Sequence, residues 1–160
     1  MNDVDAKKVG AKISVLSNLW GDLENLKKRL PMAIAELKKA IKANSQDKDK
    51  LRFYAAIYEP TQKFEAAAVS AAKDLKALLA DVSDRKLKAA KTPAEVKEKL
   101  RKNLPSLIAA ANTGERFILS FGERSREFGP PDFASVSACM NYNKYMMNHV
   151  TELKVAINTI

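Results

Sequence analysis

Cys139 and His149 are the side chains in this sequence best suited to hold a metal or form a nucleophile–base pair, and each residue type occurs once. Both fall in a segment with helical periodicity. Ten residues of helix place them about 80° apart around the axis and about 15 Å apart along it. Metal ligands and nucleophile–base pairs must lie within bonding or hydrogen-bonding distance. We therefore expect a core cysteine and a helix-face histidine, with no metal site.

The acidic residues form no catalytic constellation either. No Asp or Glu precedes His149 by three or four positions, as the Glu-x-x-His motif of helical bundles requires. Carboxylates mostly alternate with Lys or Arg at helical spacing, as Glu95 and Lys99 do, which is typical of solvated surface pairs. The sequence thus predicts no enzyme, no cofactor and no small-molecule substrate. A bundle enzyme, or a carrier with Trp20 or the methionines lining an apolar cavity, is the last alternative.

The best candidate for a functional surface is the basic segment between residues 85 and 102. Its eight cations stand against only Glu95 and Glu98. The segment spans the expected turn between the second and third helices, so we expect its charge to gather at one end of the molecule. Clustered cations attract phosphate on nucleic acid or anionic lipid, although Lys-rich faces also serve solubility alone. The candidate contacts are Arg85, Lys86, Lys88, Lys91, Lys97, Lys99, Arg101 and Lys102.

Two other basic clusters occur at residues 27–29 and 38–42, and part of their charge is expected to converge with this segment. Residues 85–102 contain no Phe, Tyr or Trp, so they lack a stacking platform for single-stranded nucleic acid. The helices expected around them are too long for a helix-turn-helix. Charge is therefore the property of this segment that indicates a partner.

The last third of the chain has a different character. It carries no net charge, whereas residues 1–50 carry +4 and residues 51–105 carry +5 of the total of +9. Aromatic and Met side chains cluster near its middle, and Tyr145 and Met147 fall off the main apolar stripe. Apolar character on more than one helix face indicates central burial or a second interface. The candidate protein-interface residues are Tyr142, Tyr145, Met146 and Met147.

The composition also suggests a cellular location. A single Cys excludes an internal disulfide and fits a reducing compartment. The first residues are acidic and polar, unlike a secretory signal, and no run approaches the ~18 apolar residues of a membrane span. We therefore expect a cytoplasmic protein.

Hydrophobic spacing predicts a long helix at the start of the chain. Val4 to Ala43 should form this helix, with a bend at Pro31. Alternating steps of four and three residues are typical of a continuous apolar seam against neighbouring helices. The predicted seam positions are Val9, Ile13, Leu16, Trp20, Leu23, Lys27, Leu30, Ile34, Leu37 and Ile41.

Three more helices are expected to follow. A capping signal at Thr92–Glu95 marks the start of the third helix, and glycine and proline separate it from the last. The expected landmarks are a second helix over 48–90 bent at Pro60, a third helix bent at Pro105 and broken near 112–114, a stop at Gly129–Asp132, and a last helix beginning near Asp132.

Short turns between these helices favour antiparallel neighbours. The predicted fold is all-α: one domain over residues 1–160, an elongated antiparallel bundle of about four long helices with proline kinks. The first functional hypothesis is a non-enzymatic interaction protein (a scaffold, adaptor, inhibitor or assembly subunit) that contacts itself or a protein partner through helix faces. The alternative is an anionic-surface binder that uses residues 85–102 to hold nucleic acid or acidic membrane lipid.

Overall fold

The computed structural model describes residues 1–121 and 133–160. Every regular element in these two ranges is an α-helix, which confirms the all-α class. The described part has six helices where four were expected. They are α1 (Asp3–Lys12), α2 (Val15–Ala43), α3 (Lys48–Asp81), α4 (Asp84–Ala89), α5 (Pro93–Leu119) and α7 (Ala134–Thr159).

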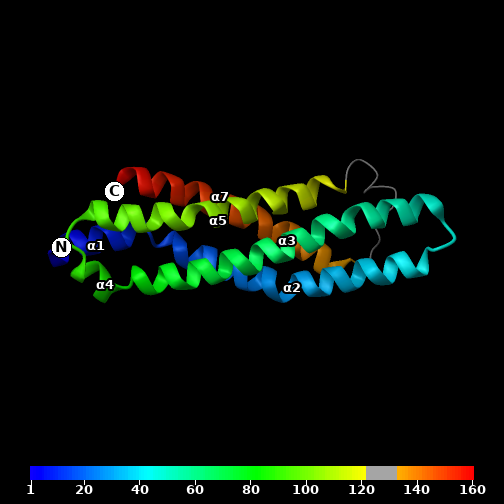
Figure 1. Cartoon of the computed structure of the whole chain (residues 1–160), viewed down its shortest axis with the longest axis horizontal. Coiled ribbons are helices and arrows are strands. Elements are labelled where there is room, and N and C mark those ends of the chain that lie inside the picture. The colour runs from blue at the N-terminus through cyan, green and yellow to red at the C-terminus, as the bar shows by residue number, and fades with distance from the viewer. Residues whose placement is uncertain (122–132) are drawn as a thin grey trace.

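The four long helices lie side by side along the long axis of the molecule (Figure 1). α2 contacts α3 and α7, and α5 contacts the same two helices. The chain passes along this axis in α2, returns in α3, passes outward again in α5 and returns in α7 (Figure 1). As a result, both chain ends lie at one end of the molecule with α1, α4 and the start of α5, and the α2–α3 turn lies at the other.

Two of the predicted long helices are each split near one end. The first breaks at Ile13–Ser14 and the second at Val82–Ser83. Ile13 and Val15 are both buried, although residues two apart in a continuous helix point about 200° apart. The break lets both side chains enter the core. It also sets α1 apart from α2, and α1 packs against α4.

The seam of α2 agrees with the prediction at every second position and is shifted by one residue at the positions between. Leu23, Leu30 and Leu37 are fully buried, as predicted. The positions between them are taken by the fully buried Leu19, Leu26 and Ala33, whereas Lys27 is exposed and Ile34 is only partly buried. Trp20 and Ile41 also lie at the edge of the core. Heptad spacing therefore continues through Leu16, Leu23, Leu30 and Leu37, and beyond the break at Ile13–Ser14 the prediction was wrong only at the alternate positions.

α5 runs without interruption through the break predicted at residues 112–114. The Thr113 hydroxyl donates to Ala110 O at 2.9 Å, and Gly114 is buried against α7. Pro31, Pro60 and Pro105 each lie inside a helix that continues on both sides, and the bends expected there stay predictions. Among the described helices, none has the length and hydropathy to cross a bilayer.

The start of α7 is held by another helix. The Glu36 carboxylate of α2 accepts hydrogen bonds from the backbone N–H groups of Ser135 and Val136, at 2.8 and 3.1 Å. The N-cap residue, Phe133, makes no side-chain cap of its own. A carboxylate at a helix N-terminus satisfies free amides and complements the helix dipole. The stop predicted at Gly129–Asp132 lies outside the described residues.

Candidate functional site

The structure brings the predicted basic segment together at one end of the molecule. Arg85, Lys86 and Lys88 lie on α4, and the last four cations of the segment lie on the first turns of α5. Lys91 lies in the turn between these helices, and α4 and the start of α5 share the end that holds both termini (Figure 1). All eight side chains are exposed except those of Lys97 and Lys99, which are half-buried.

α1 adds cations that the sequence analysis did not assign to this site. Lys7, Lys8 and Lys12 lie on α1, which packs beside α4. Lys7 and Lys88 line a groove of about 320 Å³ between the two helices, with Asp84 at its edge. The apolar residues Ile13 and Val15, two positions apart, were the available signal for the break that separates α1 from α2.

We define the basic end as residues 1–12 and 84–102. It contains eleven Lys and Arg against five Asp and Glu, a net charge of +6 within the total of +9. The remainder of the chain, although much longer, carries only +3. The charge of the protein is therefore concentrated where α1, α4 and α5 meet.

Most of the acidic groups at the basic end are engaged within it. Glu95 Oε2 accepts a hydrogen bond from Lys91 N at 2.9 Å, and Thr92 Oγ1 accepts one from Glu95 N at 3.3 Å. These two bonds form the predicted cap of α5. In a standard capping box Glu95 would accept from the backbone N–H of the N-cap residue Thr92, whereas here it accepts from that of Lys91. Glu98 pairs with Arg101 at 3.1 Å, and Asp3 lies 3.8 Å from Lys88.

Most of the cations, by contrast, are not paired. Within the described residues, nine of the eleven basic side chains of the basic end take part in no ion pair. Of these nine, Lys12 donates a hydrogen bond to Thr159 O, which leaves eight unpaired. Their positive potential is therefore not neutralised by the chain itself. These eight are Lys7, Lys8, Arg85, Lys86, Lys91, Lys97, Lys99 and Lys102.

The other basic clusters do not join this end. Lys38, Lys39 and Lys42 lie in the last turns of α2, next to the α2–α3 turn at the opposite end of the molecule (Figure 1). Residues 27–29 lie in the middle of α2. The convergence expected from the sequence therefore involves α1 and not these two clusters.

The predicted interface residues of α7 have unequal exposure. Tyr145 is 56% exposed, whereas Tyr142 and Met147 are partly buried against the core. Met146 is completely buried, so its side chain is not available to a partner. The surface that remains for an interface is centred on Tyr145.

His149 has a partner that the sequence analysis missed. Its Nδ1 lies 2.5 Å from Oδ2 of Asp22, which links α7 to α2. Asp22 is only 8% exposed, and this burial raises the pKa of its carboxyl, while the hydrogen bond and charge of His149 act in the opposite direction. Spacing indicated only that Asp22 faces the core, because Asp22 follows Leu19 by three residues and precedes Leu26 by four.

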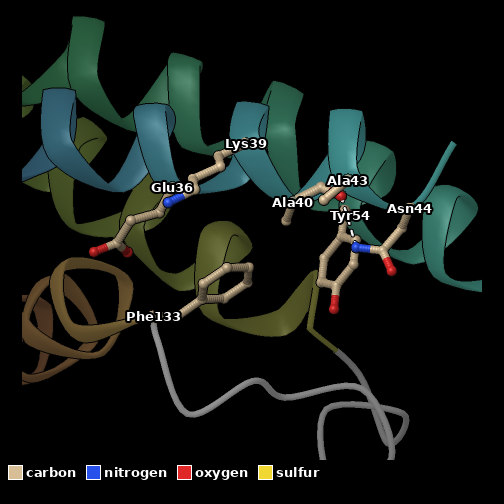
Figure 2. Close-up of a pocket in the computed structure, with 7 residues that line it drawn as sticks. All are labelled: Glu36, Lys39, Ala40, Ala43, Asn44, Tyr54 and Phe133. Atoms are coloured by element: carbon tan, nitrogen blue, oxygen red, sulfur yellow. Dashed lines mark hydrogen bonds between the residues drawn. The ribbon is translucent and has the colours of Figure 1, made fainter.

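Neither Cys139 nor the pocket at the start of α7 offers an obvious reactive group. Cys139 is a buried core residue as predicted, and burial raises the pKa of its thiol to about 12. A pocket of about 270 Å³ lies between α2, α3 and the start of α7, with Glu36, Tyr54 and Phe133 in its wall (Figure 2). Both Glu36 oxygens already bond to α7. Among the described residues, no three His, Cys, Asp or Glu side chains are grouped to hold a metal.

No family model, no curated protein and no solved structure matches this chain. The helical-bundle architecture does not by itself indicate an activity, because bundles host many unrelated functions. Function therefore has to be inferred from the charges and contacts of this chain.

Proposed function

We propose that this chain is a non-enzymatic binding protein that holds an anionic partner at its basic end. The observation that carries the proposal is the set of eight unpaired cations on α1, α4, the turn after α4 and α5. Three separate helices and one turn contribute to it, and most of the acidic groups among them are engaged with their neighbours.

Concentrated positive charge of this kind attracts phosphate-bearing surfaces and accelerates encounter with them. The interaction is sensitive to ionic strength, because bound counterions are released from nucleic acid and because salt screens charges on lipid headgroups. A solvated face that only maintains solubility would show no saturable, salt-dependent binding. Salt-dependent binding that is lost when the basic end is reversed, and kept when an equal charge is reversed elsewhere, therefore separates a working surface from a solubility feature.

The test is a titration of the protein against duplex DNA and against anionic vesicles, each at low and at high salt. A variant with Lys97→Glu, Lys99→Glu and Arg101→Glu should lose binding. The matched control reverses Lys38, Lys39 and Lys42 to Glu, because it changes the net charge equally at the opposite end. Circular dichroism verifies that both variants remain helical.

Equal loss of binding in the two variants would mean that net charge, and not the basic end, attracts the anion. Absence of salt-sensitive binding to either surface by the wild-type protein would refute the proposal. Loss confined to the first variant supports it.

A second candidate function is contact with a protein, or with another copy of this chain, through α7. The exposure of Tyr145 beside the half-buried Met147 favours it, because aromatic and Met side chains are enriched at interfaces. Tyr145→Ala should then lower the molar mass measured by light scattering, or abolish retention of a partner in a pull-down. A wild-type protein that is monomeric and retains no partner would refute this candidate.

A further inference from the structure

We propose that the partner of the basic end is the phosphate backbone of a nucleic-acid duplex, bound without sequence readout. This inference rests on the proposed function and adds the identity of the anion. It depends on four properties of the basic end: the extent of its charge, its exposed apolar groups, its aromatic content and the face that α5 presents.

The unpaired cations reach from the end of the molecule onto its flank. α4 and Lys91 lie at the end, and α5 runs from Pro93 along the long axis (Figure 1). Lys102 is nine residues into α5, which is about 14 Å along the helix. A flat bilayer pressed against the end would leave Lys102 beyond the Debye length of ~8 Å at physiological salt. A duplex carries one charge per ~1.7 Å of its axis and can present phosphates along the same flank.

The basic end offers little apolar surface to insert into a bilayer. Surface-bound amphipathic helices bury an apolar face below the lipid headgroups. Six large apolar side chains are exposed in the described residues, and only Val4 belongs to the basic end. The apolar face of α1, which includes Ala6 and Val9, is already buried in the protein. This distribution favours a partner that is bound by charge alone.

The chemistry of the segment also disfavours single strands and base readout. Residues 1–12 and 84–102 contain no aromatic side chain on which an unpaired base can stack. Glu95 and Glu98 lie on the exposed side of α5, where they would face the negative phosphates on either side of a groove. α4 has only six residues. The contacts left to the basic end are those between Lys or Arg and phosphate, which position a duplex without reading its sequence.

The experiment measures binding of the full chain to a 20-base-pair DNA duplex, an RNA duplex of the same sequence, the corresponding single strand, and vesicles of phosphatidylserine and phosphatidylcholine. For a DNA duplex the slope of log K against log salt is about −0.9 per phosphate contacted, so five contacts predict a loss of about 500-fold for a fourfold rise in salt. An unrelated duplex of equal length should bind with the same affinity.

The contribution of α1 is tested by a variant with Lys7→Glu and Lys8→Glu. The matched control is Lys27→Glu with Lys28→Glu, which makes the same charge change on the exposed middle of α2. The α1 variant should weaken duplex binding and lower the steepness of the salt slope by about two contacts, or about 1.8 units. The control should leave both unchanged.

Binding to vesicles but not to either duplex would overturn this inference and leave the proposed function standing. Binding to none of these probes would refute both. Two other results would also overturn the inference. Single strands bound as tightly as duplexes would contradict the preference for a duplex, and unchanged duplex binding by the α1 variant would contradict the contribution of Lys7 and Lys8.

Discussion

Gly114 lies on α5 where the side chain of Asn143 on α7 packs against the helix backbone. A Cβ placed on Gly114 would lie 1.9 Å from Oδ1 and 2.4 Å from Cγ of Asn143. Asn143 is completely buried, and its Nδ2 donates to the Met147 sulfur at 3.4 Å. Gly114→Ala must therefore displace a buried amide that has little room to move.

The cost follows from two opposing effects. Inserting a methyl group into a packed core costs about 1–3 kcal/mol, whereas replacing Gly by Ala inside a helix recovers about 1 kcal/mol. We expect a net destabilisation of about 1–2 kcal/mol, because the displaced Asn143 also loses its contact with Met147. For a chain of this size that corresponds to a fall in Tm of roughly 2–8 °C.

The matched control is Gly21→Ala, where an added Cβ on α2 would meet nothing within 4 Å. That substitution should stabilise the protein by about 0.5–1 kcal/mol. Asn143→Ala should rescue Gly114→Ala, since Asn143 Oδ1 has no hydrogen-bond partner among the described residues and the clash disappears with the amide. Urea and thermal unfolding of the two single variants and the double variant measure the coupling between the sites. A Gly114→Ala protein as stable as Gly21→Ala would refute the close approach of α5 and α7.

Three other substitutions or modifications test single contacts. Asp22→Asn removes a buried acid whose pKa is raised by the fold. The stability of wild type relative to this variant should therefore be greatest below the unfolded pKa of 3.8 and should fall as pH rises through the folded pKa, as measured by urea unfolding across pH. A difference that grows with pH would contradict this sign. Glu36→Ala should cost about 1 kcal/mol, because the amides of Ser135 and Val136 lose their acceptor, and Glu36→Gln should cost less. Cys139, with a pKa near 12 against 9.0 when exposed, should react with a thiol reagent at pH 8 about 1,000-fold more slowly in the folded protein than in urea, and rapid native labelling would show that the residue is accessible.

The all-α class could be predicted because apolar spacing is helical over most of the chain, but the register of α2 could not be settled locally. Two overlapping heptad patterns are present, one through Trp20 and Lys27 and the other through Leu19 and Leu26. The charged Lys27 within the predicted seam indicated that the pattern through Trp20 and Lys27 was the wrong one. The break at Ile13–Ser14, after which only the alternate seam positions change, contains no Gly or Pro, and it follows from the burial of Ile13 and Val15 in the core.

The candidate site was partly predictable for a similar reason. Residues 85–102 gather at one end because a short turn keeps the ends of consecutive helices together, which is a local property. The position of Lys7 and Lys8 beside this segment follows from the packing of α1 against α4, which is a tertiary property. The Asp22–His149 contact joins residues 127 positions apart, and no spacing rule along a single helix reveals such a pair.

The two polar contacts between α2 and α7 together fix the axial register of these helices. Glu36 and Asp22 are fourteen residues apart on α2, and Ser135 and His149, which they contact, are fourteen apart on α7. The equal intervals, two heptads or about 21 Å on each helix, fix one alignment of the two antiparallel helices. A one-residue insertion between the contact points on either helix would turn one partner by about 100° and break one contact. Length changes in these segments should therefore be tolerated only when both helices change together, whatever apolar residues the insertion adds.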